Sequence, residues 1–545
     1  MGFSPRVLRN AMLSLMCLLA PELTRPVAAQ DLTARQGLGY VVDPVARSPR
    51  LLGMGQLQLV EDRHNALALW DFAGNPTGIA EAESVSTFEY RPRLRSGSVF
   101  GDVPAGAPLY ERQELGDHQS DHVIETWRRQ RGSPAYGLVA NISKLNQDRP
   151  FDATSELRDS YKVPAIGGIV NGRMPWIHST RFDYALRGQY GSSVAEHGYY
   201  EIFHVAQGDY LGKKTATVPP PDLFTPDHDE VTNLRYGIAF AMRVTKEIKA
   251  AIGYDRQLAK WRSTQEGLRS TSRVNEDRPF DTGQATLVGR LGRHLAWAAD
   301  GRAWHVASEQ FFFWTVSAGP TQTSLVGDGK RLDRDLKGTS LRTQARWMSG
   351  AFELGAGFGT TFSREIITPW YPTLAGEQPG FNDFLYQIST RAGADTLRLP
   401  QQVSASQVEE RSVDLLLGGS WHPPGGRGLM GVEFQRHNTK LNQAGFATGP
   451  KPQGWDIRGG GEYRVGPSFL VRGGLNYGIH DQDDLTADNA YRSTIATVGI
   501  GIQPPGSRWS ADLALANEWL RPDFVDGANT RGSERQMSLQ VRWPF

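Results

Sequence analysis

The sequence has almost no cysteine, no long apolar run and no surplus of either charge. Only one of its 545 residues, Cys17, is cysteine, and it lies in an N-terminal stretch that we expect to be removed. We therefore expect no disulfide and no thiol-ligated metal in the exported chain. Beyond that stretch no run of about 18 apolar residues occurs, which excludes a transmembrane helix. The 59 basic residues match 58 acidic ones, which excludes the basic surplus typical of nucleic-acid binding.

Glycine and tryptophan are plentiful, whereas the apolar content is low. The chain has 60 glycines and 14 tryptophans, but only 39% of its residues are hydrophobic. A soluble chain of this length needs a large apolar core. A membrane barrel needs only an apolar outer face, and it places tryptophan and tyrosine at the two membrane interfaces.

The N-terminus has the three parts of a secretory signal. Arg6 and Arg9 form a basic start, residues 11–20 form an apolar segment too short to cross a bilayer, and Val27-Ala28-Ala29 offers small residues for cleavage. We predict a signal peptide over residues 1–29. A buried first helix is the alternative.

The C-terminal segment alternates between apolar and polar residues. The apolar positions are Met537, Leu539, Val541, Trp543 and Phe545. Alternation with a period of two predicts a strand with one apolar face. In a membrane barrel this last strand pairs with the first, because lipid tolerates no open strand edge. An edge strand of a secreted β-protein is the alternative. The terminal phenylalanine resembles the recognition signal of bacterial outer-membrane barrels, which implies the barrel-assembly machinery as a partner.

Two hairpins repeat this alternation at greater length. Residues 234–254 carry apolar side chains at every second position up to a turn at Lys246-Glu247, and the pattern then resumes. Residues 341–362 do the same about a turn at 348–351, except at Thr343 and Thr360, with arginines and glycines between these positions. An arginine or lysine facing lipid near the midplane costs about 2–4 kcal/mol. The arginines of the second hairpin must therefore point inward or lie near the rims.

Short turns alternate with long polar segments along the rest of the chain, as in an outer-membrane barrel whose long loops face outward. We predict eight short turns, at 132–134, 191–192, 246–247, 292–293, 349–350, 423–427, 466–467 and 504–506. We predict nine long loops, at 97–119, 146–175, 207–233, 259–283, 306–339, 364–410, 438–453, 480–490 and 520–534. These imply an all-β protein, a single antiparallel transmembrane barrel over 84–545 with about 18 strands, although 14 or 16 stay open.

Residues 30–83 do not alternate, and part of this segment resembles a known family. The residues that carry the resemblance are Gly53, Met54, Gly55, Asn65, Asn75, Pro76 and Gly78. Their arrangement is similar to that of the FadL-like superfamily, which includes long-chain fatty-acid transporters and PorV-like barrels. The resemblance covers about 30 residues and departs from the usual pattern at Gln56 and Leu57. It implies that 30–83 folds into the barrel lumen as a plug. A periplasmic leader is the alternative.

No motif in the sequence predicts an enzyme or a cofactor site. Residues 355–359 have the glycines of a phosphate loop but lie inside an alternating strand. The acidic clusters at 226–230 and 480–484 lack the spacing of a calcium loop. Histidines that could serve catalysis occur without a nucleophile elbow or a zinc-type His-Glu-x-x-His spacing; they are His122, His178, His204, His294, His305 and His437. We expect no cofactor, no metal and no nucleic-acid partner.

The 364–410 loop contains a concentrated aromatic patch. Its members are Trp370, Tyr371, Phe381, Phe384 and Tyr386. This patch either forms an apolar groove for a substrate at the cell surface or packs on itself. The first functional hypothesis is an outer-membrane channel or transporter for hydrophobic or amphipathic small molecules, surrounded by lipid and gated by the plug. The alternatives are a non-transporting scaffold or secretion partner of the PorV-like kind and, less favoured, a membrane-embedded hydrolase.

Overall fold

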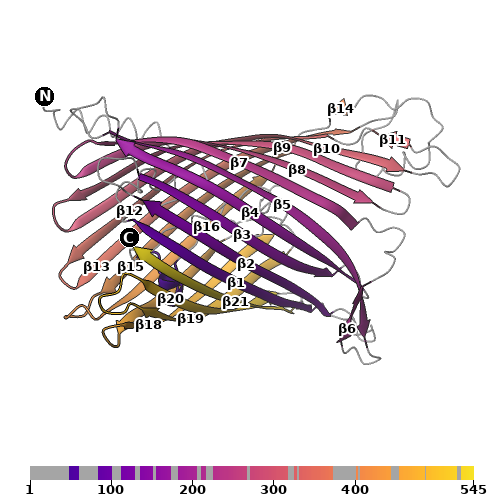
Figure 1. The fold of residues 1–545 in the computed structure, drawn as a ribbon. Coiled ribbons are helices and arrows are strands. Elements are labelled where there is room, and N and C mark those ends of the chain that lie inside the picture. The colour runs from indigo at the N-terminus through magenta and orange to yellow at the C-terminus, as the bar shows by residue number, and fades with distance from the viewer. Residues whose placement is uncertain are drawn as a thin grey trace.

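The fold is a single antiparallel sheet rolled into a barrel (Figure 1). This computed structural model describes residues 48–59, 84–100, 112–128, 135–150, 155–173, 182–204, 210–215, 225–266, 270–316, 325–327, 331–371, 401–402, 406–443, 453–484, 487–524 and 529–544. Within these residues the sheet has 21 strands. Three of them, β6, β11 and β14, are short and pair with a single neighbour each, so eighteen long strands form the wall.

The long strands follow one another in chain order around the wall. Their bounds are β1 (Val85–Phe100), β2 (Arg112–Arg128), β3 (Ala135–Pro150), β4 (Ser155–Arg173), β5 (Phe182–His204), β7 (Thr225–Arg243), β8 (Ile248–Glu266), β9 (Ser270–Leu291), β10 (Leu295–Val316), β12 (Arg331–Ser349), β13 (Phe352–Tyr371), β15 (Ser406–Trp421), β16 (Gly428–Gln443), β17 (Gln453–Arg464), β18 (Phe469–Asp484), β19 (Ala487–Ile502), β20 (Ser510–Phe524) and β21 (Asn529–Pro544). The short strands are β6 (Tyr210–Thr215), β11 (Leu325–Gly327) and β14 (Gln401–Gln402).

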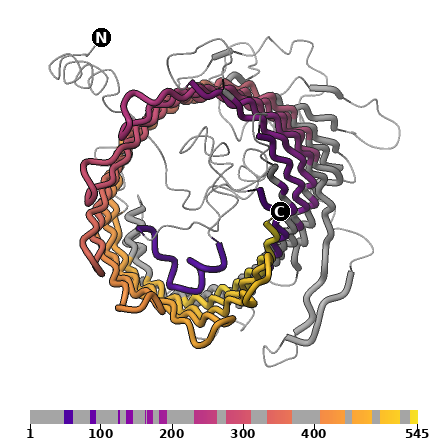
Figure 2. The backbone as a smooth tube through the Cα atoms, turned by 60° about the vertical axis from the view of Figure 1, so that its left-hand side comes forward, coloured from indigo at the N-terminus to yellow at the C-terminus, as the bar shows by residue number. Residues whose placement is uncertain are grey.

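The last strand pairs with the first. In β21 Pro544 lies opposite Val85 of β1, and the pairing continues to Asn529 opposite Phe100. With the pairings between consecutive strands, this contact returns the sheet to its start, and Figure 2 shows the resulting ring. The structure confirms the prediction of a single antiparallel barrel of about 18 strands. Along β21, Ser538 and Gln540 are buried on the inner side, whereas Trp543 is exposed on the outer side. Phe545 lies outside the described residues.

The outer surface is apolar because every second side chain of the wall points away from the lumen. Leu415 and Leu417 of β15 and Val432 of β16 are exposed on this surface, whereas their neighbours Ser412 and Glu433 are buried on the inside. Exposed aromatic side chains lie at the ends that carry the short turns, among them Trp347, Phe352, Trp421, Tyr463, Phe469, Trp509 and Trp543. An apolar band edged by aromatic residues is the surface that a bilayer requires.

An arginine placed in this band tests the assignment of the outer face. Leu417→Arg should lower the free energy of unfolding from lipid vesicles by about 2–4 kcal/mol, because it moves a cation into hydrocarbon. Urea unfolding followed by tryptophan fluorescence measures the loss. The matched control is Leu416→Arg, one residue away and facing the lumen, where water can solvate the charge. Equal losses in the two variants would contradict the assignment.

One predicted turn is wrong. Gly191 and Ser192 lie inside β5, where Gly191 pairs with Ala165 of β4 and with Asn233 of β7. Hydrogen bonding from both sides holds the backbone extended, and Gly191 does not take the positive φ that marks a tight turn. The positive-φ glycines in the described turns between strands are Gly292, Gly350, Gly425, Gly426 and Gly506. Because β4 and β5 are antiparallel, the chain reverses between Arg173 and Phe182, and most of the predicted loop 146–175 is strand in β3 and β4.

Several predicted loops are largely strands. Between β8 and β9 only residues 267–269 lie outside the strands, although 259–283 was predicted as a loop. Likewise β13 continues through the predicted loop residues 364–371. The physical reason is that strand pairing continues beyond the apolar band. There both faces meet water, so apolar alternation ends before the ladder of hydrogen bonds does.

Candidate functional site

Residues 48–59 form a short segment inside the barrel, drawn in indigo against the wall in Figure 2. It begins with the helix α3 (Pro49–Gly53), which contacts β18, β19, β20 and β21. Ser48 caps the helix by accepting a hydrogen bond from Leu51 N at 3.5 Å, and Pro49 fits the first helical turn. The chain then turns at Gly55 and Gln56, which have φ values of 74° and 62°. The predicted motif Gly53-Met54-Gly55 lies at the centre of this segment.

Glycines of the wall allow the backbone of the motif to approach closely. A Cβ atom at Gly460 of β17 would collide with the carbonyl of Met54, and one at Gly474 of β18 would collide with the amide of Gly55. From the other side, a Cβ at Gly55 would lie 2.7 Å from the carbonyl oxygen of Gly459. Side chains are therefore excluded at these positions on both surfaces. The backbone of the motif therefore packs directly against the backbone of the wall at these glycines.

Wall glycines also make room for the apolar side chains of the segment. Ideal Cβ atoms at Gly431 of β16, Gly418 of β15 and Gly355 of β13 would each lie 2.9 Å from Leu57 or Leu59. Gly355 belongs to the glycine-rich run that resembled a phosphate loop, so its absent side chain is explained by this packing. Leu57 is completely buried.

Two apolar clusters join the segment to the wall. One contains Leu51, Met54, Leu57 and Leu429, and the other contains Leu52, Ile495, Ala514 and Ala516. Burying a side chain of the size of leucine or methionine stabilises a contact by about 1.5–3 kcal/mol. Met54, which is fully buried, therefore contributes a large share of the attachment.

Thr497 of β19 binds the motif by its hydroxyl group. Its Oγ1 accepts a hydrogen bond from Gly55 N at 2.9 Å and donates one to the Gly53 carbonyl at 3.1 Å. The Gly53 carbonyl belongs to the last residue of α3 and the Gly55 amide lies just beyond it, where the helix itself supplies no partner. The hydroxyl thus satisfies the hydrogen bonding of these two backbone groups in the turn that ends the helix.

Glu433 of β16 holds the far end of the segment. Its carboxylate accepts hydrogen bonds from Gln58 N at 2.6 and 2.8 Å and from Leu59 N at 2.6 Å. The Gln58 side chain adds a bond from Nε2 to Gln435 Oε1 at 2.9 Å, and Arg346 donates to the Leu59 carbonyl at 3.3 Å. Because Glu433 is only 2% exposed, its charge depends on these donors for solvation.

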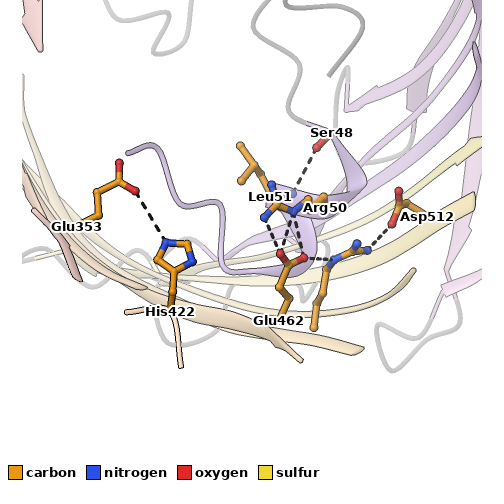
Figure 3. Close-up of polar contacts among 8 residues, drawn as sticks. Ser48, Arg50, Leu51, Glu353, His422, Glu462 and Asp512 are labelled. Atoms are coloured by element: carbon orange, nitrogen blue, oxygen red, sulfur yellow. Dashed lines mark hydrogen bonds and ion pairs between the residues drawn. The ribbon is translucent and has the colours of Figure 1, made fainter. Parts of the chain in front are cut away.

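An ion-pair chain holds the helix at the other end, as Figure 3 shows. Arg50 Nη2 lies 2.5 Å from Glu462 Oε1 of β17, and Arg50 Nε donates to Oε2 at 3.0 Å. Arg472 of β18 reaches the same carboxylate at 3.2 Å and Asp512 of β20 at 2.6 Å. Glu462 therefore receives two guanidinium groups, one from the segment and one from the wall, and through Arg472 the chain of ion pairs connects α3 to β17, β18 and β20.

Most of the remaining predicted site residues fall outside the part of the chain that the structure describes. Asn65, Asn75, Pro76 and Gly78 lie outside the described residues, and so do Phe381, Phe384 and Tyr386 of the aromatic patch. The backbones of Trp370 and Tyr371 end β13 and pair with β14. The boundary at residue 84 stays a prediction, although β1 begins close to it, at Val85.

Sequence reasoning missed the wall half of the site. Glu433, Glu462 and Thr497 were visible only as polar residues on the inner side of alternating strands, where many others have the same pattern. The runs Gly459-Gly460-Gly461 and Gly473-Gly474 were a usable signal. Glycine inside a strand weakens it and marks the close approach of another backbone.

His437 belongs to a hydrogen-bonded set on the inner side of β15 and β16. Its Nδ1 lies 2.5 Å from Asp414 Oδ1, and its Nε2 lies 3.0 Å from Thr439 Oγ1. This order of carboxylate, imidazole and hydroxyl resembles that of nucleophilic catalysis. Thr439, however, is buried in the wall, so a substrate carbonyl has little access to its hydroxyl. We interpret the set as part of the polar lining.

Elsewhere the lumen is lined by charged side chains. Asp255 of β8 accepts from Arg187 of β5 and from Arg235 of β7, the latter at 3.2 Å. Across residues 48–59 and the described strands, no group of three histidine, cysteine or acidic residues has the arrangement of a metal site. The described helix is neither long nor apolar enough to cross a membrane.

Together these features define a polar-lined β-barrel with an apolar exterior and an N-terminal segment bound to its inner wall.

No protein-family model matches the sequence, and no curated protein matches it. Among solved structures, the chain is similar to a Pseudomonas aeruginosa FadL homologue at 11% identity, with a TM-score of 0.37 over 91% of this chain and 98% of that one. It is also similar to the Ralstonia pickettii toluene transporter TbuX at 12% identity, with a TM-score of 0.31 over 91% and 98% of the two chains. A third is the Yersinia pestis ferric yersiniabactin receptor FyuA, at 9% identity, with a TM-score of 0.42 over 84% and 80%. The FadL-like group that residues 53–78 resemble is thus represented among these structures.

Proposed function

We propose that the protein is an outer-membrane transporter whose lumen is closed in part by residues 48–59. The observation that carries this proposal is the fit between this segment and the wall. Backbone contact at glycines, an ion-pair chain and a buried carboxylate all act on twelve residues inside the lumen. A segment with no role in the lumen would require none of these complementary wall residues.

The outer surface supports the location. Its apolar band, edged by aromatic side chains, suits a bilayer. The three widest separations between consecutive long strands, at 205–224, 317–330 and 372–405, fall at one end of the barrel, where Figure 1 labels β6, β11 and β14. In an outer membrane the end with short turns faces the periplasm and the end with long connections faces the outside. The last strand, with its alternating face, is the part that the barrel-assembly machinery would bind.

The lining of the lumen favours an amphipathic substrate over a purely apolar one. Arg235 of β7 and Arg302 of β10, each with a side chain that is 25% exposed, lie on strands away from the bound segment and place charge in the lumen. A molecule with a polar head finds partners there, whereas a hydrocarbon without one would meet charged side chains that it cannot solvate. The substrate class that we propose is therefore a small molecule with one polar or charged end.

Deletion of residues 48–59 tests the proposal. We expect the deleted protein to insert into vesicles as the intact protein does and to admit small dyes or antibiotics many times faster, because the lumen loses its bound segment. Liposome efflux with the intact protein as reference measures the rate. Equal rates in the two proteins would overturn the role of the segment in closing the lumen.

A further inference from the structure

Four exposed cations form a cluster on the outer surface of the barrel, and we call it the cation patch. It consists of Lys337 of β12, Arg364 of β13, Arg411 of β15 and Lys440 of β16. On β13 and β15 the cation comes directly after the apolar outward residues, whereas Thr339 on β12 and the exposed Arg436 and Asn438 on β16 lie between those residues and the cation. On β15, for example, Arg411 comes immediately beyond Val413, Leu415 and Leu417 in the outward series. The patch therefore borders the apolar band at the end that we place outside the cell.

The patch places like charges directly opposite each other. Lys337 pairs in register with Arg364, and Arg411 pairs in register with Lys440. Side chains at opposite positions of an antiparallel pair lie about 5 Å apart at Cβ, so two such pairs repel and destabilise the sheet. An anion shared between the strands would remove this repulsion.

The neighbouring residues offset only part of the charge. Lys337 Nζ lies 2.7 Å from Asp335, and Arg364 donates to the neutral Gln407 at 2.7 Å. Glu409 lies opposite Arg364, and Gln407 donates to its carboxylate at 3.0 Å. Two carboxylates thus stand against four cations, which leaves a local surplus of two positive charges on a chain whose formal net charge is only +1.

The position of the cation patch at the edge of the apolar band indicates which kind of anion it binds. Arg411 lies over the ring of Phe362, 5.0 Å from its centroid, so the guanidinium touches the apolar band. A ligand held here meets cations on one side and apolar surface on the other. Arginine and lysine bind phosphate by charge-assisted hydrogen bonds, and basic clusters beside a bilayer attract anionic lipid headgroups.

We propose that the cation patch binds the phosphate-bearing headgroup of an outer-leaflet lipid, whose acyl chains lie along the apolar band. The proposal rests on the outer-membrane placement given above but is independent of transport. It goes beyond the lumen, because every residue of the patch faces away from it.

The test compares lipid binding by the intact protein and by the variant Arg411→Gln/Lys440→Gln in phosphatidylcholine nanodiscs. Diphosphorylated lipid A is titrated and its adducts are counted by native mass spectrometry. We expect about thirtyfold weaker binding in the variant, since each cation near a membrane surface contributes about 1 kcal/mol. Lys337→Gln/Arg364→Gln provides a second variant with the same expectation in case the first fails to fold.

The matched control removes two outward cations that already face carboxylates. Arg256→Gln/Lys260→Gln on β8 alters residues paired in register with Asp281 and Asp277 of β9, so we expect binding close to that of the intact protein. An equal loss in this control would overturn the patch as the site. Two ligand controls test the headgroup assignment. Equal binding of dephosphorylated lipid A would overturn it, and so would full competition by inorganic phosphate at equal concentration. Unchanged dye efflux in all variants separates this result from the proposed transport.

Discussion

A barrel carrying Gly460→Val and Gly474→Val should fold but lose its bound segment and become leaky. The added side chains would overlap the carbonyl of Met54 and the amide of Gly55, which are backbone groups and cannot rotate away. Release forfeits the two hydrogen bonds of Thr497 and the burial of Met54 and Leu57, together about 4 kcal/mol or more. A loss of that size shifts the open-to-closed ratio roughly a thousandfold. Liposome efflux should therefore approach the rate of the protein without residues 48–59.

The barrel supplies a control for this prediction one residue away. Gly473 faces the lipid side of β18, and the nearest atom to a Cβ there is the Thr497 carbonyl oxygen at 4.0 Å. Gly473→Val should leave efflux unchanged, although it changes the same strand by the same side chain. If Gly473→Val leaked as much as Gly474→Val alone, the leak would come from a weakened wall and not from a displaced segment.

The barrel could be predicted from the sequence because its cause is local and repeated. Each outward residue must be apolar, so the pattern of Leu234, Tyr236 and Ile238 recurs on strand after strand, and eighteen strands follow from the turns between them. Where water wets both faces this constraint ends, and prediction fails there. Residues 259–283 were predicted as a loop although almost all of them are strand.

The wall half of the site could not be predicted, because it depends on contacts between distant parts of the chain. Arg50 and Glu462 are separated by 412 positions, and no local pattern selects Glu462 from other inward acids. The motif Gly53-Met54-Gly55 was found only through its resemblance to a family. Its wall partners follow from the register of β17 against β18, which places Gly460 directly opposite Gly474.

Two kinds of contact with different properties thus hold residues 48–59 against the wall. The contacts at glycines determine which backbone fits against the wall, but they contribute little to the free energy of binding. The charged contacts of Glu433 and Glu462 contribute energy, and they can be lost one at a time without altering the shape of the wall. If the protein works as proposed, opening is easier when the closed state is held by groups that a polar substrate can compete for.

Loss of the Glu462 carboxylate should therefore be the second most effective way to release the segment. Glu462→Ala leaves Arg50 without its carboxylate on the wall, while Arg472 keeps its contact with Asp512. Breaking a buried pair costs about 3–5 kcal/mol. Because both side chains are 13% exposed, we take the lower end, about 3 kcal/mol, or roughly a hundredfold in the open-to-closed ratio. Efflux of a small dye measures the change.

A charge swap distinguishes attraction from loss of packing in this prediction. Arg50→Glu alone places two carboxylates together and should leak at least as much as Glu462→Ala. Adding Glu462→Arg gives the new carboxylate at position 50 two guanidinium groups, at 462 and 472, and should restore most of the closure. Asp300→Ala serves as the matched control, since Asp300 is also 13% exposed and pairs with Arg302 at 3.0 Å on β10, away from the segment. A swap that leaks as much as Arg50→Glu, or a leak of equal size from Asp300→Ala, would show that the Arg50–Glu462 pair does not hold the lumen closed.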